Sequence, residues 1–307
     1  MVDRFLNSAA GAALIPAARA FVRFTPPSTT KDHLWHRVID PYLAWRNHRF
    51  VAQTIAGSFG GNTKDILQQY LYYFGIWEPA VTRFVRRRLK SGDGFVDVGA
   101  NVGYFSLLAA QRVGYRGRVT AVEASPEVFT ELQRNLRRNT VGIRAVPLAA
   151  SDKAGTIRIY HGSEGNCGSS TTVEGLSGYR ESTEVAAAPL SDALSQIEIA
   201  SARIIKIDVE GAEAAVLSGI EAAMNDIRSD CEFLVEIHPQ MLAQAGRSAQ
   251  EVFDWFADRD FHPYLIENDY DASAYLWPAP TPLPQRIWHC PEWDANVVFS
   301  RIVATEL

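Results

Sequence analysis

The chain is short of cysteine and has no long apolar segment. Its 307 residues include three cysteines, Cys167, Cys231 and Cys290, and no C-x-x-C pair. Cysteines this few and scattered exclude a disulfide framework and a cysteine zinc site, and they favour reduced thiols in the cytoplasm. Because no run of about 18 apolar residues occurs, we expect no membrane-spanning helix.

Acidic residues are scarce in the first part of the chain, and basic residues are scarce in the rest. Residues 1–90 hold 13 Lys and Arg against 5 Asp and Glu, whereas residues 91–307 hold 17 against 30, for a net charge of −5. The acidity of the larger part argues against nucleic acid as a partner. From residue 91, short β-branched runs alternate with helical stretches. We therefore divide the chain into a mainly helical N-terminal extension, residues 1–90, and an α/β domain, residues 91–307.

The extension begins with an apolar stretch, residues 9–24, which Pro16, Arg19 and Arg23 interrupt. This pattern predicts an amphipathic helix that packs on the rest of the protein. Peripheral membrane contact through residues 1–24 is the alternative, because basic amphipathic helices also bind membrane surfaces. We interpret the extension as a lid or docking element, and a homo-oligomer is compatible with the sequence.

Seven apolar segments of the larger part predict buried strands. They span residues 94–100, 118–124, 143–150, 202–209, 232–237, 261–266 and 296–302. Because helical stretches separate them, we expect a doubly wound, mostly parallel sheet with helices on both faces. An additional strand is expected over residues 156–160, and the Gly-, Ser- and Thr-rich residues 162–182 are expected to form a loop.

The first predicted strand ends in Asp97-Val98-Gly99-Ala100-Asn101-Val102-Gly103. Ligands of doubly wound sheets bind at such strand ends, where glycines let the backbone approach closely. The spacing is G-x-x-x-G, not the G-x-G-x-x-G that admits a dinucleotide, and the Asp97 carboxylate would repel a pyrophosphate. S-adenosylmethionine, with its sulfonium and ammonium groups, fits this turn better. Glu123, at the end of the second strand, would accept hydrogen bonds from the ribose hydroxyls.

Four segments resemble, in order, the motifs of FkbM-type class I S-adenosylmethionine-dependent methyltransferases. They are FVDVGANVGYFSLLAA (95–110), AVEASPEVFTELQRN (121–135), LAASDKAG (148–155) and IIKIDVEGAE (204–213). The resemblance implies a Rossmann-like seven-stranded sheet whose last strand is antiparallel. It places Asp97, Gly99, Asn101 and Gly103 at the methionine part of the cofactor, Glu123 at the ribose, and Ser151 and Asp152 at the adenine. Ala124 and Ser125 are further cofactor-binding candidates. Glu78 is expected to reach over the same pocket.

Charged residues alternate with apolar ones at the ends of the next two strands. Lys206, Asp208 and Glu210 would share one side of the first by period-2 spacing, and Glu236 and His238 end the second. We assign catalysis to Lys206, Asp208, Glu236 and His238, with His238 as general base because an ordinary histidine titrates near neutral pH. Asp208 and Glu236 alternatively orient His238 or hold a divalent cation. A metal is not favoured, because the sequence has no compact acidic triad.

Acceptor recognition is assigned to Glu210 and to Asn166 and Ser169 on the long loop. The resemblance implies acceptors such as sugar hydroxyls, polyketide hydroxyls and carboxylates, so we expect methyl transfer to an oxygen of a sugar, glycan or other small molecule. No Asn/Asp-Pro-Pro-aromatic motif of amino methylation follows the fourth strand, which again argues against nucleic acid. Two alternatives are an NAD-type oxidoreductase on a similar sheet and a non-catalytic binding module with a degenerate methyltransferase fold.

Overall fold

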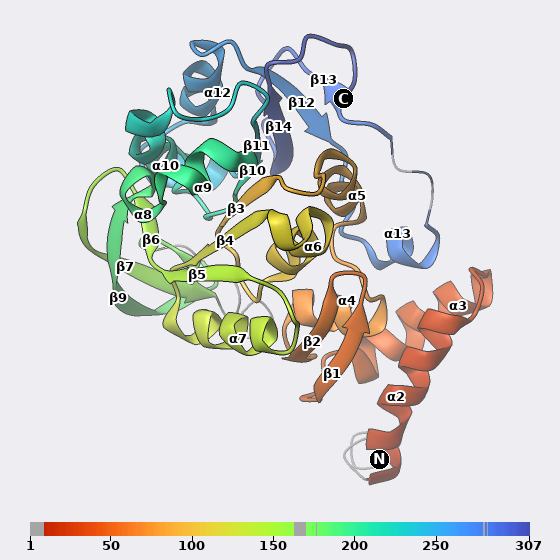
Figure 1. The fold of residues 1–307 in the computed structure, drawn as a ribbon. Coiled ribbons are helices and arrows are strands. Elements are labelled where there is room, and N and C mark those ends of the chain that lie inside the picture. The colour runs from red at the N-terminus through yellow and green to blue at the C-terminus, as the bar shows by residue number, and fades with distance from the viewer. Residues whose placement is uncertain (1–8, 163–169, 176, 279, 281) are drawn as a thin grey trace.

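A computed structural model describes residues 9–162, 170–175, 177–278, 280 and 282–307. Its main element is a sheet of eight strands in the order β13-β12-β14-β11-β10-β3-β4-β5 (Figure 1). In chain order these are β3 (Gly94–Val98), β4 (Arg118–Glu123), β5 (Ile143–Pro147), β10 (Ala202–Ile207), β11 (Glu232–Ile237), β12 (His262–Ile266), β13 (Gln285–Arg286) and β14 (Ala295–Ser300). The alternation of strands with helices confirms the predicted α/β class.

The sheet is mixed. Strands β5, β4, β3, β10 and β11 pair in parallel, and β14 runs antiparallel to both of its neighbours, β11 and β12. The expected count of seven strands is wrong by one, because the two-residue strand β13 pairs with β12 at the edge. Residues 285–286 were missed because they lie in a Pro-rich stretch, which is not typical of a strand.

Helices cover both faces of the sheet, because successive residues of a strand point to opposite faces. In β3, Phe95 belongs to the core of one face, whereas Val96 and Val98 belong to the core of the other. The first face is covered by α5 (Pro79–Arg88) and α6 (Tyr104–Val113), and the second by α9 (Gln196–Ser201), α10 (Glu213–Ile220) and α12 (Ala249–Ala257). The other helices of this part are η2 (Gly114–Arg116), α7 (Pro126–Arg137), α8 (Leu190–Ala193), η3 (Glu221–Ala223) and α11 (Pro239–Gln244).

A second, four-stranded sheet follows β5. It consists of β6 (Ala149–Ser151), β7 (Gly155–Gly162), β8 (Ser170–Thr171) and β9 (Tyr179–Pro189), in the order β6-β9-β7-β8. The expected strand over residues 156–160 is confirmed within β7. The expected loop over residues 162–182 is wrong in part, since β8 and the start of β9 lie within it. Pairing of β9 with β7 over most of its length outweighs the low strand propensity of the Glu and Ala residues of β9.

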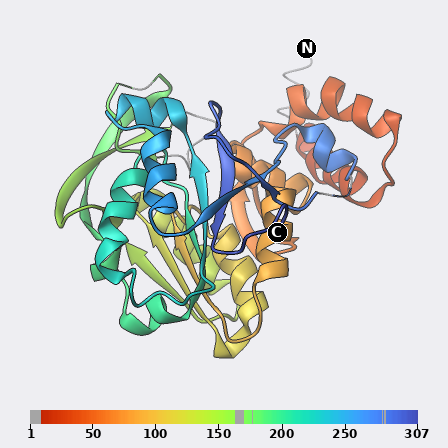
Figure 2. The same cartoon turned by 90° about the horizontal axis from the view of Figure 1, so that it is seen from above.

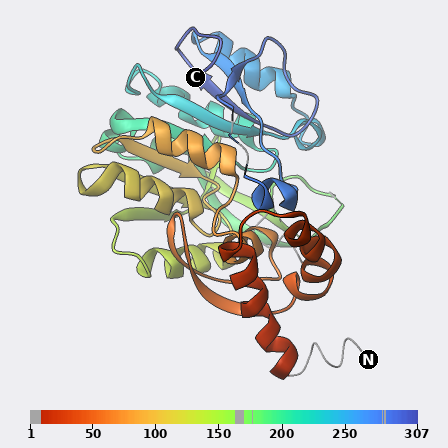
Figure 3. The same ribbon diagram turned by 90° about the vertical axis from the view of Figure 1, so that its right-hand side faces the viewer.

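The N-terminal part contains helices and one hairpin. Its elements are α2 (Ala9–Phe24), α3 (Thr29–Leu34), the π-helix η1 (Trp35–Ala44), β1 (Arg49–Thr54), β2 (Gly57–Asn62) and α4 (Ile66–Tyr73). The β1–β2 hairpin was not predicted. In Figures 2 and 3 the N-terminal helices lie at one side of the α/β body, next to α13 (Ala272–Leu276).

Helix α2 packs on the protein, as predicted. Ile15 and Val22 are buried in a cluster with Trp35 and Tyr73, to which Leu276 of α13 also belongs. No helix of the described ranges is long and apolar enough to cross a bilayer.

Helix α5 belongs to the same core as the main sheet. Its Val81 and Phe84 share a buried cluster with Phe95 of β3 and Leu107 of α6. The predicted boundary between residues 90 and 91 therefore passes between two elements of one core. The division into two domains stays a prediction.

Candidate active site

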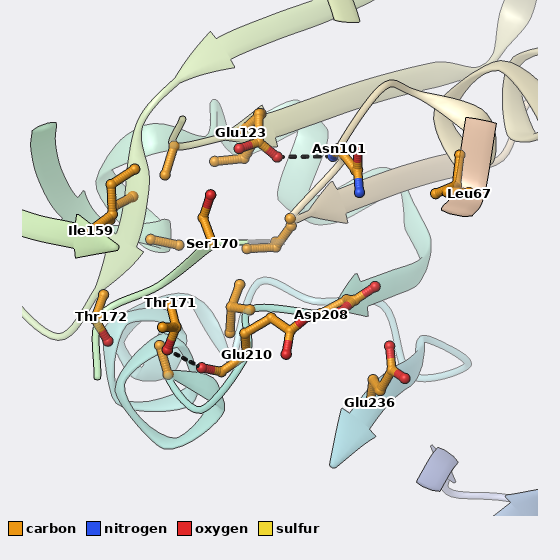
Figure 4. Close-up of a pocket in the computed structure, with 18 of the residues that line it drawn as sticks. Leu67, Asn101, Glu123, Ile159, Ser170, Thr171, Thr172, Asp208, Glu210 and Glu236 are labelled. Atoms are coloured by element: carbon orange, nitrogen blue, oxygen red, sulfur yellow. Dashed lines mark hydrogen bonds between the residues drawn. The ribbon is translucent and has the colours of Figure 1, made fainter. Parts of the chain in front are cut away.

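A cavity of about 330 Å³ opens where β3, β4, β10 and β11 end. Eight of the predicted site residues line it: Glu78, Gly99, Asn101, Glu123, Ala124, Asp208, Glu210 and Glu236. Figure 4 shows Asn101 and Glu123 along one side, and Asp208, Glu210 and Glu236 along the other. The cavity therefore lies at the carboxyl ends of the parallel strands, the edge at which ligands of doubly wound sheets are expected to bind.

The turn after β3 has a backbone that few residues can adopt. Gly99 has φ 79°, and a Cβ placed there would lie 1.7 Å from the backbone oxygen of Asp208. Asn101 has φ 50°. Among described residues, four non-glycines have positive φ, and three of them, Glu78, Asn101 and Glu210, line the cavity. Such strain is typical of functional sites, because the surrounding structure must stabilise it.

Glu123 is fixed by two backbone donors. Its carboxylate accepts hydrogen bonds from the N–H groups of Asn101 and Ser125, both at 2.8 Å, and the residue is 6% exposed. Burial raises the pKa of Glu123 to about 7, although the two N–H donors favour the ionised form. Ser125 itself lies outside the cavity lining and caps α7. Glu123 thus presents an oriented carboxyl group to any ligand in the cavity.

Asp97 and Gly103 do not line the cavity. Asp97 is 1% exposed and accepts a hydrogen bond from Ser106 Oγ at 2.6 Å, while its Oδ1 has no hydrogen-bond partner among the described residues. Burial raises the pKa of Asp97. Gly103 adopts φ 91°, and a Cβ there would lie 2.6 Å from Leu132 Cδ1. Both residues therefore contribute to the packing of the turn and do not face the cavity.

Lys206 and Asp208 form an ion pair beneath the cavity. Lys206 Nζ lies 2.6 Å from Asp208 Oδ2 and 5.0 Å from the centre of the Phe105 ring. Burial would lower the pKa of Lys206, but the carboxylates of Asp208, Asp97 and Glu78 reverse this and raise it. Burial would likewise raise the pKa of Asp208, and Lys206 holds it below its usual range. Both groups are therefore charged.

Tyr270 joins the buried Glu78 and the half-buried Glu236 across the cavity. Its Oη lies 2.5 Å from Glu78 Oε1 and 3.0 Å from Glu236 Oε1. Burial raises the pKa of both glutamates. A phenol has one proton, so the second contact needs a proton on one of these raised carboxyl groups. Sequence reasoning missed Tyr270, although it follows β12, another strand whose carboxyl end meets this edge.

His238 lies behind the cavity wall. It is 9% exposed, and its Nε2 lies 3.7 Å from Glu210 Oε2 and 3.9 Å from Glu236 Oε1. Its Nδ1 lies 3.4 Å from Asp294 Oδ1. Burial would lower the pKa of His238, but Asp294, Glu236 and Glu210 raise it to about 10. A histidine already protonated at neutral pH is a poor general base.

The remaining predicted residues lie elsewhere. Ser151 and Asp152 do not line the cavity, and the Ser151 hydroxyl donates to Asp152 at 3.2 Å. The residues just before them, 148–150, line it instead. Asn166 and Ser169 lie outside the described residues. Sequence reasoning also missed Thr171, which lines the cavity and donates to the Glu210 carbonyl at 2.6 Å.

Residues 97–263 match the model of a family described as the methyltransferase FkbM domain. Over 163 residues, 44% of this chain, the sequence is 31% identical to the 31-O-demethyl-FK506 methyltransferase FkbM of Streptomyces tacrolimicus. It is 28% identical over 163 residues, 43% of this chain, to methyltransferase sdnD of Sordaria araneosa. Each alignment covers 62% of the relative, so this chain spans less than two thirds of their length.

Among solved structures, methyltransferase FkbM of Methylobacillus flagellatus aligns with 76% of this chain and 55% of its own, at 16% identity and a TM-score of 0.44. The match over residues 97–263, more than half of the chain, shows that the protein belongs to the FkbM family of methyltransferases.

Proposed function

We propose that this enzyme transfers the methyl group of S-adenosylmethionine to an oxygen, preferably a hydroxyl, of a sugar, glycan or other small-molecule acceptor. The observation that carries the proposal is Glu123, whose carboxylate is fixed by two N–H donors at 2.8 Å on the wall of the cavity. A carboxyl group in this position suits the two vicinal hydroxyls of a ribose.

The residues of the turn fit the same cofactor. Only glycine leaves room at position 99, where a Cβ would meet the Asp208 carbonyl, so the backbone there can lie against a ligand. Asp208 is ionised beside this turn and would stabilise a cationic ligand group. S-adenosylmethionine supplies a methyl group that its sulfonium already activates. The chain then has to bind the acceptor, align its oxygen and exclude water.

The acceptor side of the cavity is acidic. Glu78, Asp208, Glu210 and Glu236 all line it. Because carboxylates repel each other in a site of low dielectric, this lining favours a neutral hydroxyl over a carboxylate acceptor. The rings of Tyr70, Trp77 and Tyr270 also line the cavity and offer apolar surface to a sugar ring.

Proton removal from the hydroxyl is assigned to the wall formed by Asp208 and Glu236. The sequence analysis favoured His238 as the base, but the histidine lies behind these two carboxylates. Because the carboxylate pair faces the cavity, we assign the contact with the acceptor to Asp208 and Glu236 and a positioning role to His238.

Two titrations and one screen test the proposal. In isothermal titration calorimetry we expect binding of S-adenosylmethionine and no binding of NAD. Binding of NAD alone would favour the oxidoreductase alternative, against which the family match already argues. A screen of hydroxylated and carboxylated acceptors with methyl-labelled S-adenosylmethionine should label hydroxyl compounds. Cofactor binding with no labelled product from any acceptor class would favour a non-catalytic binding module.

A further inference from the structure

We propose that Asp208, Glu236 and His238 form a binding site for a divalent metal ion. One carboxylate oxygen from each acid and one ring nitrogen of the histidine lie within 4.8 Å of one another. Two ligands on opposite sides of an ion with bonds of about 2.2 Å are about 4.4 Å apart, so small side-chain rotations would close this set around an ion. From the sequence, a divalent cation at Asp208 and Glu236 was an alternative that was not favoured, and the structure adds His238 to this pair.

The histidine nitrogen is oriented as a metal ligand would be. Nε2 of His238 is buried and has no hydrogen-bond partner among the described residues, and it points toward Glu236 and Glu210. On the other side of the ring, Nδ1 lies 3.4 Å from Asp294 Oδ1. In metal sites a carboxylate commonly accepts the second N–H of a ligating histidine and fixes the ring, and the ion takes the place of the proton on the other nitrogen. An unpartnered buried nitrogen otherwise costs free energy.

The two carboxylates are also held by partners. Lys206 Nζ contacts Asp208 Oδ2 at 2.6 Å, and Tyr270 Oη contacts Glu236 Oε1 at 3.0 Å. Lys206 thus orients Asp208, and Tyr270 orients the Glu236 oxygen that lies 3.9 Å from His238 Nε2. Supporting contacts of this kind position the ligands before the ion binds.

The local charge favours a cation. The ammonium of Lys206 is surrounded by the carboxyl groups of Asp208, Asp97, Glu78 and Glu236. Glu210 and Asp294 add acidic groups on the His238 side. Lys206 and His238 are two basic groups facing these six acids, so a divalent ion would relieve the repulsion between Asp208 and Glu236. Two oxygens and one imidazole suit Mn²⁺ or a similar transition-metal ion better than Ca²⁺.

The ion would lie next to the acceptor side of the cavity, since Asp208 and Glu236 line it. Its role there rests on the proposed methyl transfer: a bound cation would stabilise the negative charge that develops on a hydroxyl oxygen as its proton leaves. The site itself does not depend on that function.

Manganese binding tests the site. We would titrate the purified full chain with Mn²⁺ and follow the free ion by electron paramagnetic resonance, without S-adenosylmethionine or acceptor. We expect one site in the unchanged protein. Asp208→Asn, Glu236→Gln and His238→Gln should each weaken Mn²⁺ binding about tenfold or more, and Asp294→Asn by a smaller factor. Glu131→Gln, which removes an exposed carboxylate of α7, is the matched control and should leave affinity unchanged.

A second measurement needs no variant. Electron spin-echo modulation of bound Mn²⁺ should show a directly coordinated ¹⁴N from His238. No saturable site, or a site without ¹⁴N coupling, would overturn the proposal even if a variant failed to fold. Calorimetry with S-adenosylmethionine in metal-free buffer separates the two proposals: cofactor binding without a manganese site would leave only the function standing, and the reverse result only the metal site.

Discussion

At the scale of single residues, Glu123 shows how burial and hydrogen bonding oppose each other. Its pKa of about 7 means that in the free protein the carboxyl group is largely protonated below neutral pH. Two ribose hydroxyls can donate only to the ionised form. We therefore expect the affinity for S-adenosylmethionine to rise with pH up to about 7 and then level off, with a proton released on binding in the lower range.

Calorimetry across about pH 5.5 to about 8.5, in buffers of different ionisation enthalpy, checks this dependence. Glu123→Gln should weaken binding and remove the pH dependence.

Burial of Glu123 also affects the stability of the folded protein. Because the folded pKa is raised above the unfolded value of 4.5, the contribution of Glu123 to stability is full below pH 4.5 and lost as pH rises through about 7. An affinity for S-adenosylmethionine that falls as pH rises would contradict the assignment of Glu123 to the ribose hydroxyls.

Position 99 has no room for a Cβ atom. A Cβ would lie 1.7 Å from the backbone oxygen of Asp208, and φ is 79°. Gly99→Ala should lower the free energy of unfolding by about 2–4 kcal/mol, because two backbone segments must separate. Gly142→Ala is the matched control, since nothing lies within 4 Å of its Cβ position. Urea unfolding of both variants measures the difference, and equal losses would show that the close approach is not tight.

At the scale of elements, the C-terminal end of α5 is anchored to β11 by a buried acid. Glu232 is 1% exposed, forms an ion pair with Arg88, and lies 3.0 Å from Arg203 Nη1. Arg88→Ala alone should lower the free energy of unfolding by about 1–2 kcal/mol, because Arg203 still compensates the charge of Glu232. The Arg88→Ala/Arg203→Ala double variant should lower it by about 3–5 kcal/mol.

Denaturant unfolding of the two single variants and the double variant gives the coupling energy. Arg158→Ala, which removes an exposed pair with Glu184, is the control and should leave the denaturant midpoint unchanged within error. Strict additivity of the two arginine variants would mean that the two side chains do not share the charge of Glu232.

Strongly periodic elements could be predicted from the sequence, and elements that depend on distant pairing could not. Strands such as β10, all six residues of which are buried, are rich in isoleucine and other apolar residues. The β1–β2 hairpin contains Gly57, Gly60 and Gly61, which made residues 57–62 look irregular. Asn135 of α7 and Asn139, just after that helix, accept hydrogen bonds from the backbone of β2, and a contact so distant in sequence leaves no local pattern. Strand β9 was missed for the same reason.

At the scale of the whole molecule, the site is completed from both flanks of the family segment. Residues 97–263 match the family model, yet Glu78 precedes that segment and Tyr270 follows it. The position of strand ends predicted the acids at the ends of β4, β10 and β11, because sheet topology brings strand ends together. The position of strand ends did not predict the contact between Glu78 and Tyr270. Side-chain contacts between two flanking segments depend on tertiary packing and leave no spacing pattern in the sequence.

The Tyr270 contact predicts a functional effect. Tyr270→Phe removes the hydroxyl between Glu78 and Glu236, so these two acids lose a shared partner. Turnover with a hydroxyl acceptor should fall about tenfold or more, while the Kd for S-adenosylmethionine changes little, since Glu123 is untouched. Tyr115→Phe, at a side chain 91% exposed, is the control. Equal loss of turnover and cofactor affinity would indicate a general structural defect.

The basic N-terminal part contacts the rest of the chain through specific side chains. Arg19 Nε donates to the carbonyl of Tyr72 at 2.8 Å, and Arg23 Nη1 donates to that of Gln53 at 2.6 Å. Part of the positive charge of residues 1–90 is therefore used to hold α2 against the hairpin and α4. Ile15 and Leu14, two neighbouring residues of α2, differ in their contribution to this packing.

Ile15 is 5% exposed, whereas Leu14 is 39% exposed. If α2 is held by packing, Ile15→Ala should lower the free energy of opening of this helix by about 2–4 kcal/mol, and Leu14→Ala by less than about 1 kcal/mol. Hydrogen exchange of the α2 amides measures both, because a terminal helix can open without global unfolding. If the helix instead serves a membrane surface, Ile15→Ala should leave exchange unchanged and weaken binding to anionic vesicles. We expect the first result, since the apolar side chains of Ile15 and Val22 are already buried against Trp35 and its neighbours.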